Sequence, residues 1–172
     1  MEKIELRINI YGEPVLRKKS RQVKGITERH REILSRMAQL MYSSKGIGLA
    51  APQVGINESM IVVDIGSGLY KLVNPCIVKR EGKQVMEEGC LSFPGVAVKI
   101  TRAKRITLKA QDEFGKPVSI EAQDLLATVL QHEIDHLQGR LIIDYASVWE
   151  RLRLQGKLRM LAKKAKEYEL SK

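Results

Sequence analysis

Residues 131–136 read Gln-His-Glu-Ile-Asp-His and lie inside a segment, residues 122–137, whose apolar residues recur at helical spacing. Residues four apart share one face of a helix, so His132 and His136 can direct imidazole nitrogens at the same metal ion. Glu133 is rotated by about 100° from His132 and can reach a water bound to that ion. This H-E-x-x-H pattern therefore predicts a hydrolytic metal site on a helix.

The segments on either side of this helix predict the fold. Residues 27–42 form a predicted amphipathic helix with Thr27 as its N-cap, and residues 148–168 form a second long helix. Between them lie β-forming stretches separated by glycine-containing turns. The expected elements are a hairpin of 59–65 with 69–73, a hairpin of 77–80 with 83–86, and strands at 96–100, 105–110 and 116–120. Since strands and helices do not alternate regularly, we expect an α+β fold, with mainly antiparallel sheets around a central helix carrying HExxH, an N-terminal helix and a C-terminal basic helix.

The composition suits a globular enzyme. The chain has 172 residues, of which 44% are hydrophobic and 29% charged, which excludes a disordered tail or a fibre. Its first residues carry acids where a signal peptide needs a basic start and an apolar core, and no apolar run reaches membrane-spanning length. We expect residues 1–172 to form a single catalytic domain in the cytoplasm, without membrane contact and with 147–172 as a basic helical extension. Cys76 and Cys90 are then expected to be free thiols.

Two histidines leave a metal ion under-coordinated, so a third ligand is expected elsewhere in the chain. The remaining histidine, His30, lies far upstream beside an apolar helix position and is interpreted as structural. Cys90, between a glycine and a strand-like stretch, would complete a set of one Cys and two His with an open position for water, as in catalytic sites. Spacing alone leaves Cys90 equally open to interpretation as a buried thiol, and Cys76 is interpreted as structural.

Residues 46–53, Gly-Ile-Gly-Leu-Ala-Ala-Pro-Gln, superficially fit a phosphate-binding loop. Such a loop follows a strand and opens a helix, whereas here a helix precedes the segment and Pro52 would interrupt a helix begun after it. We interpret the segment as a tight loop whose glycines let the backbone approach a ligand, with Gln53 as a hydrogen-bond donor.

Three segments together resemble the motifs of the peptide deformylase family. Residues 46–53 match G-x-G-L-A-A-x-Q, residues 88–92 match E-G-C-L-S, and residues 131–139 match Q-H-E-x-D-H-L-x-G. The resemblance extends to about Ser147. It implies an enzyme that removes the N-formyl group from the initiator methionine of newly synthesised polypeptides and releases formate.

The resemblance also implies a role for each site residue. The implied metal ligands are Cys90, His132 and His136. Glu133 is the implied general acid/base, while the Gln53 side chain and the Leu91 backbone N–H are expected to stabilise the oxyanion. In the family the peptide lies beside the first two motifs like an added strand. The residues expected to contact it are Ile47, Gly48 and Gly89, with Leu125 and Val129 in the methionine pocket.

The implied cofactor is one divalent metal ion per chain. The resemblance favours Fe(II), with Ni(II), Co(II) or Zn(II) as alternatives. Because the anionic thiolate of Cys90 lowers the Lewis acidity of the metal relative to a three-histidine site, the identity of the metal is expected to matter for activity. Oxidation of Fe(II) or of Cys90 is an expected route of inactivation.

The C-terminal segment is strongly basic. From Ser147 onward the chain has eight basic and three acidic residues, so half of the net charge of +10 lies there. Five apolar residues recur at roughly helical spacing and predict a packed face: Val148, Leu152, Leu158, Leu161 and Ala165. By similarity to family members whose C-terminal helix docks on ribosomal RNA, we expect ribosome contact, while a solvated helix with an ordinary basic excess explains the charge equally well.

Two other function classes are compatible with parts of the sequence. A general HExxH metallopeptidase would cleave unformylated peptides, and an RNA-binding protein with a lapsed site would keep the basic tail but bind no metal. Formate release from a formylated peptide, compared with cleavage of its unformylated counterpart, distinguishes these classes.

Overall fold

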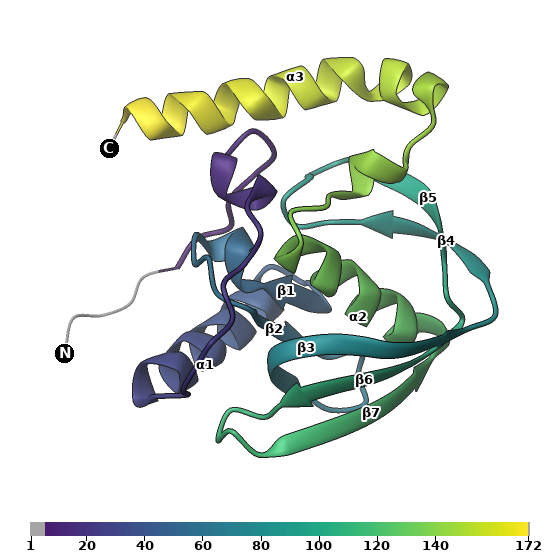
Figure 1. Cartoon of the computed structure of the whole chain (residues 1–172). Coiled ribbons are helices and arrows are strands. Elements are labelled where there is room, and N and C mark those ends of the chain that lie inside the picture. Colours follow the sequence, from purple (N-terminus) through teal and green to yellow (C-terminus); the bar gives the residue numbers. More distant parts are fainter. Residues whose placement is uncertain (1–5, 172) are drawn as a thin grey trace.

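The computed structural model describes residues 6–171 and shows two antiparallel sheets around a helix, as Figure 1 illustrates. The α-helices are α1 (Glu28–Ser43), α2 (Asp124–Leu137) and α3 (Val148–Leu170), and the 3-10 helices are η1 (Pro14–Arg17), η2 (Ala51–Val54) and η3 (Ile142–Tyr145). The strands are β1 (Gly48–Ala50), β2 (Met60–Val63), β3 (Tyr70–Glu81), β4 (Gln84–Gly89), β5 (Ala97–Arg102), β6 (Arg105–Gln111) and β7 (Pro117–Gln123). The α+β prediction is confirmed.

One sheet has the strand order β1-β2-β3-β6-β7, and the other consists of β4 and β5. The predicted hairpin of residues 59–65 with 69–73 is present, because β2 pairs with β3 and aligns Met60 with Val73. The segment 46–53, predicted as a loop, contains a short strand, β1, which pairs with β2. This pairing holds the loop at the edge of the larger sheet.

The second predicted hairpin, of residues 77–80 with 83–86, is wrong. Residues 70–81 form one strand that pairs with β2 and β6, and β4 pairs with β5 in the other sheet. The strand passes through an irregularity at Asn74, whose φ of 53° is left-handed. The Asn74 side chain stabilises this bend by bonding the N–H and C=O of Val23 at 2.9 and 2.8 Å.

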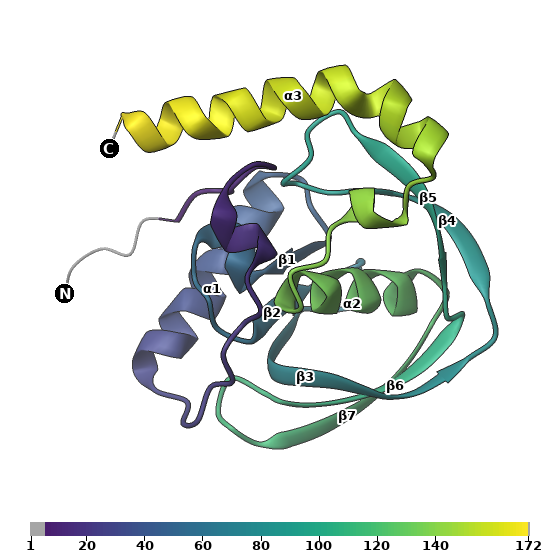
Figure 2. The same ribbon diagram turned by 45° about the horizontal axis from the view of Figure 1, so that its top comes forward.

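Strand β2 explains why α2 lies in the interior. Successive strand residues point to opposite faces, and all four residues of β2 are buried. Met60 and Val62 pack in the core with α1, whereas Ile61 and Val63 pack in a second core with α2. Figure 2 shows α2 between the larger sheet and the β4–β5 sheet. The polar side chains of α2 are therefore held inside the protein.

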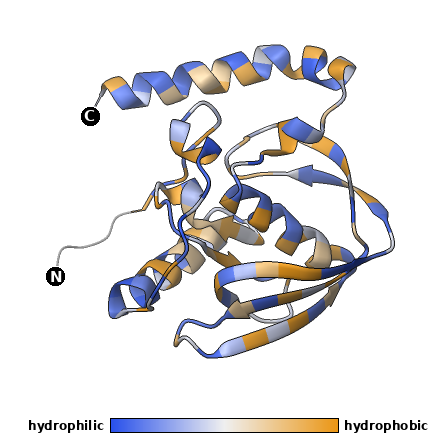
Figure 3. Cartoon of the chain, in the orientation of Figure 1, coloured by the Kyte–Doolittle hydropathy of each residue, from blue (hydrophilic) through white to orange (hydrophobic). Residues whose placement is uncertain are grey.

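Helix α3 lies across one end of the molecule and is largely hydrophilic in Figure 3. Its packed face contains Leu154, Leu158, Leu161 and Ala165. The prediction that Val148 and Leu152 also pack is wrong, because these side chains are 71% and 55% exposed. Leu152 lies six residues before Leu158, about 120° away around the helix, so it points away from the core. Within residues 6–171, no helix has both the length and the apolar character needed to cross a bilayer.

Candidate metal centre

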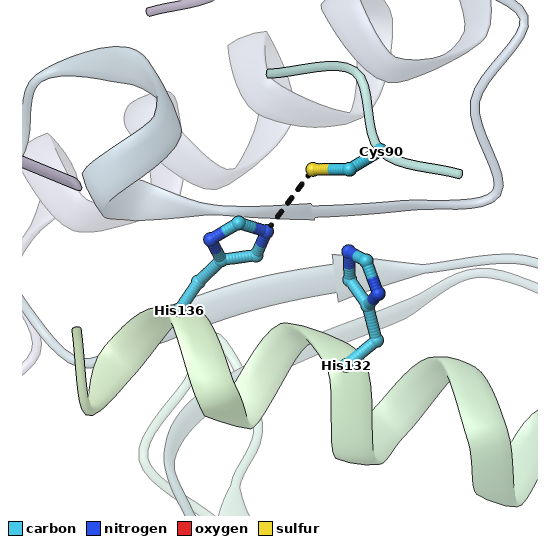
Figure 4. A group of neighbouring side chains, drawn as sticks. All are labelled: Cys90, His132 and His136. Carbon is cyan, nitrogen blue, oxygen red and sulfur yellow. Dashed lines mark hydrogen bonds between the residues drawn. The ribbon is translucent and has the colours of Figure 1, made fainter. Parts of the chain in front are cut away.

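Helix α2 and the end of β4 bring three metal-binding side chains together. His132 and His136 project from the same face of α2 toward Cys90, which directly follows β4 (Figure 4). One ligand atom from each residue lies within 4.8 Å of the other two. Cys90 Sγ is 3.3 Å from His136 Nε2. Cys90 and Cys76 are both free thiols, as expected. Cys76 is exposed on β3, so the interpretation of Cys76 as a structural residue is not supported.

Cys90 and His136 already lie at the spacing that one ion requires. A tetrahedral ion with Zn-like bond lengths places its sulfur and nitrogen ligands about 3.3–3.6 Å apart, which is close to the spacing of Cys90 and His136. His132 Nδ1 is 2.9 Å from Glu88 Oε2. An ionised carboxylate can only accept, so Nδ1 donates and the Nε2 lone pair is left for a metal. Thus an acidic partner orients one of the two imidazoles.

A buried ion-pair network supports Glu88. Arg102 donates from Nε and Nη2 to the two Glu88 carboxylate oxygens at 2.5 and 2.9 Å, and from Nη1 to Asp135 Oδ2 at 2.8 Å. Burial by itself would raise the pKa of Glu88, but the hydrogen bond from His132 and the ion pair with Arg102 hold it below its usual range. Glu88 is therefore an anion at neutral pH and an acceptor for His132.

Glu133 has the burial and the pKa that a proton-transfer group requires. Its side chain is only 3% exposed, and within residues 6–171 its Oε2 atom has no hydrogen-bond partner. Burial raises the pKa of Glu133 to about 7, although the neighbouring side chains of His132 and Arg102 act in the opposite direction. A carboxyl group with a pKa near the working pH can both take up and release a proton, as a general acid/base must.

The Gln53 side chain is fixed beside Cys90. Its Oε1 accepts from the Ala50 N–H at 2.8 Å, and its Nε2 donates to Ser92 Oγ at 3.2 Å and toward Cys90 Sγ at 3.4 Å. The amide donor is thus held at the predicted metal site by the first-motif backbone on one side and the second motif on the other. Such a preoriented donor can stabilise a developing oxyanion.

The centre opens into a cleft of about 600 Å³. Nearly all the site residues predicted from the sequence line this cleft: Ile47, Gly48, Gln53, Gly89, Cys90, Leu91, Leu125, Val129, His132 and Glu133. His136 is the exception: it is buried and does not line the cleft, but its Nε2 lies 3.3 Å from Cys90 Sγ, which does. His30 is remote: its Nδ1 accepts from the backbone N–H of Thr27 at the start of α1, in agreement with a structural role.

Gly48 is expected to be essential for the shape of this site. A Cβ atom added at Gly48 would collide with the Glu133 carboxylate and would lie 2.9 Å from Val129 Cγ1. We therefore expect Gly48→Ala to displace Glu133 and to lower kcat by roughly 10²-fold or more, as expected when a general acid/base is lost. Gly66→Ala, at a turn with open space around it but a strained φ of 100°, is the control for a general effect on folding. Wild-type kcat in Gly48→Ala would contradict the steric argument.

Glu88 and Asp135 lie in the second and third motifs, but the sequence analysis gave them no role. It also missed Arg102 and Tyr145, whose hydroxyl donates to Asp135 Oδ2 at 2.6 Å. The alternation of residues along β5 could have identified Arg102 as a buried side chain. Strand β5 alternates between exposed and buried residues, and Arg102 occupies an inward position in line with Val98 and Ile100. An inward arginine requires an acidic partner, but the identity of that partner depends on how β4 and α2 pack.

The chain is similar to known proteins along most of its length. The family model described as polypeptide deformylase matches residues 5–152. A peptide deformylase of Halothermothrix orenii is 49% identical over 141 residues, which cover 81% of this chain and 92% of the relative, and one of Thermotoga maritima is 45% identical over 161 residues, covering 93% and 98%. The crystal structure of a peptide deformylase from Thermus thermophilus superposes with a TM-score of 0.87 at 36% identity and covers 92% of this chain and 98% of the other.

Proposed function

The chain belongs to the peptide deformylase family, and we propose that Cys90, His132 and His136 hold the metal ion with which it hydrolyses formamide bonds. As a member of this family it is a hydrolase that removes the N-formyl group from newly synthesised polypeptides, and a general metallopeptidase is not favoured. The observation that carries the ligand assignment is the meeting of one thiol and two imidazoles within 4.8 Å at the base of a cleft.

In this proposal the protein residues control protons and charge at the scissile bond. A divalent metal ion held by Cys90, His132 and His136 would supply Lewis acidity for polarising a formyl group and for lowering the pKa of a water. Glu133 accepts a proton as the water attacks the formyl carbon, and it then donates that proton to the departing amine. The Gln53 amide and the backbone N–H of Leu91 stabilise the negative charge that develops on the formyl oxygen.

The cleft walls support an assignment of the substrate contacts. The cleft is lined by Ile47 and Gly48, at the start of β1, and by Gly89, at the end of β4, so an extended peptide can pair with backbone groups of these strands. Leu125 and Val129 belong to the first half of α2, about two turns and one turn before His132, and provide apolar surface for the methionine side chain.

We propose Fe(II) as the physiological metal, with Ni(II), Co(II) or Zn(II) able to occupy the same site. The site combines one thiolate with two imidazoles, a set that borderline divalent metals share. Metal analysis of protein purified without oxygen tests the assignment. Stoichiometric iron that is lost in parallel with activity on exposure to air is the expected result, and equal activity with bound zinc in air would contradict it.

One assay tests the proposed activity. Protein loaded with Fe(II) under anaerobic conditions is incubated with formyl-Met-Ala-Ser and, separately, with Met-Ala-Ser. We expect formate from the first peptide and no cleavage of the second. Hydrolysis of an internal peptide bond, or the absence of bound metal, would overturn the proposal.

We further propose that residues 1–172 form one catalytic domain acting in the cytoplasm, and that its extension, residues 147–172, contacts ribosomal RNA. The inward face of α3 is apolar, whereas its basic side chains are exposed. The adjoining Trp149 is 80% exposed at the start of the helix and adds an aromatic group to this surface. A surface of this kind is suited to a polyanion.

Neutralising the exposed face tests ribosome contact without removing the packed face. In the variant with Lys163, Lys164 and Lys166 changed to glutamine, co-sedimentation with ribosomes is expected to weaken and to depend less steeply on salt, because fewer phosphate contacts release fewer counterions. Formate release from a free tripeptide should remain at the wild-type rate. Salt-insensitive co-sedimentation that is unchanged in this variant would contradict the proposal.

A further inference from the structure

We propose that Tyr145 is a positioning residue for the metal centre. Through Asp135, Arg102 and Glu88, Tyr145 couples the position of α3 to the orientation of the His132 ring. The inference rests on the proposed metal ligands. It concerns a hydroxyl group outside the cleft, at the end of η3, three residues before α3 begins.

A continuous series of hydrogen bonds joins Tyr145 to His132. The Tyr145 hydroxyl donates to Asp135 Oδ2 at 2.6 Å, and this same oxygen accepts from Arg102 Nη1 at 2.8 Å. Arg102 uses its two other nitrogens to hold both oxygens of Glu88, and Glu88 Oε2 accepts from His132 Nδ1. Each hydrogen bond in this series therefore shares either a carboxylate oxygen or the Arg102 guanidinium group with the next one.

The groups in this series are held tightly. Arg102 and Glu88 are buried, and the Arg102 guanidinium also lies 5.1 Å from the centre of the Tyr145 ring. Burial and the hydrogen bond to Asp135 raise the pKa of Tyr145, so its hydroxyl stays protonated and remains a donor at neutral pH. A buried guanidinium with three occupied nitrogens cannot move toward one acid without moving away from the other. The orientation of Glu88, and with it the His132 ring, thus depends on how Asp135 is held.

Helix α3 holds the backbone around Tyr145. Arg151, in the first turn of α3, donates to the carbonyl oxygens of Asp144 and Ala146, which flank Tyr145, each at 3.2 Å. Arg17 bonds the Asp144 carboxylate at 2.6 Å from the other side. The position of the Tyr145 hydroxyl is therefore coupled to the first turn of α3.

The decisive variant is Tyr145→Phe, which keeps the ring over Arg102 and removes the hydroxyl. Direct partners of a metal-bound histidine are worth about 10–100-fold in affinity or activity, so for this more distant group we expect roughly a 3–10-fold loss of Co(II) affinity. We also expect a shifted visible absorption spectrum of the Co(II) form, and a lower kcat with little change in KM. The melting temperature should change little, because Tyr145 is partly exposed.

The matched control is Tyr42→Phe. The Tyr42 hydroxyl donates to Asp64 Oδ2 at 2.7 Å, and the Asp64 carboxylate otherwise accepts from the backbone N–H groups of Gly66 and Gly68. This variant loses a comparable hydrogen bond, and its Co(II) affinity and spectrum should match the wild type. Equal values for wild type and Tyr145→Phe would overturn the inference. If wild-type protein fails to bind Co(II), the proposed metal centre is refuted instead.

The part played by α3 has its own test. Arg151→Met should shift the Co(II) spectrum in the same direction as Tyr145→Phe. Because the effect is transmitted through the hydroxyl, Arg151→Met should cause no further shift in the Tyr145→Phe background. A shift of the same size in both backgrounds would show that α3 does not act through Tyr145.

Discussion

Replacing Glu133 with glutamine is expected to lower the rate of formate release by roughly 10²–10⁴-fold, the range for loss of a general acid/base. Glutamine keeps the size and a hydrogen-bonding amide, but it cannot take a proton from the attacking water. Because the side chain is buried beside the ligands without being one of them, the metal content should stay at the wild-type level. Steady-state kinetics with formyl-Met-Ala-Ser, together with metal analysis of the same sample, measures both effects.

The pH profile gives an independent measure of Glu133. Its carboxyl group must be ionised to act as a base, so the wild-type rate should fall as the pH drops through its pKa. Burial raises this pKa to about 7. A divalent metal ion held by the neighbouring ligands would add positive charge and would lower the pKa from that value. We expect the acidic limb below pH 7 in the loaded enzyme and its absence in Glu133→Gln. Formate release by Glu133→Gln at the wild-type rate would refute the assigned role.

Replacing Arg102 with methionine is expected to cause the largest loss of stability. The change removes the cation from two carboxylates, one of which, Glu88, is buried. Breaking a buried ion pair at one partner typically costs about 3–5 kcal/mol of unfolding free energy, because the remaining charge is left uncompensated. His132 also loses its oriented acceptor, so metal affinity should fall by about 10–100-fold. Urea denaturation of the apo-protein and a Co(II) titration measure the two losses separately.

Two further variants show whether this loss is specific. Arg105→Met removes an exposed arginine at the start of β6 and should change the unfolding free energy by less than about 0.5 kcal/mol. Adding Glu88→Gln to Arg102→Met removes the uncompensated charge and should recover part of the stability. A loss below about 1 kcal/mol in Arg102→Met would mean that the ion pair makes little net contribution.

The features that depend on residues close together in the sequence were predicted correctly. Helical periodicity placed α1, α2 and α3 within a few residues of their observed ends, and the H-E-x-x-H spacing placed His132 and His136 on one face. Both properties depend on residues three or four apart, which interact through the helix itself. The pairing of β2 with β3 was predicted correctly because a short turn joins two strands that follow each other in the sequence.

The wrong predictions concern strand pairing and packing between segments that are distant in the sequence. Residues 77–80 and 83–86 look like a hairpin, but β3 pairs with β6 and β4 pairs with β5, which a local pattern does not reveal. The packed face of α3 was predicted with Val148 and Leu152, although only the surface beneath the helix decides which side is covered. Register and packing partners are selected by burial of the whole core.

The H-E-x-x-H segment by itself determined that two imidazoles and a carboxylate share one helix, since helical geometry alone requires it. Tertiary structure decided which groups surround them. It brings Cys90 from the end of β4 within reach of His136, and it buries Glu133 against Gly48, which raises the pKa of Glu133. It also links His132 to Tyr145, three residues before α3, through Glu88, Arg102 and Asp135. These contacts join residues tens of positions apart, so only the packing of the two sheets around α2 creates them.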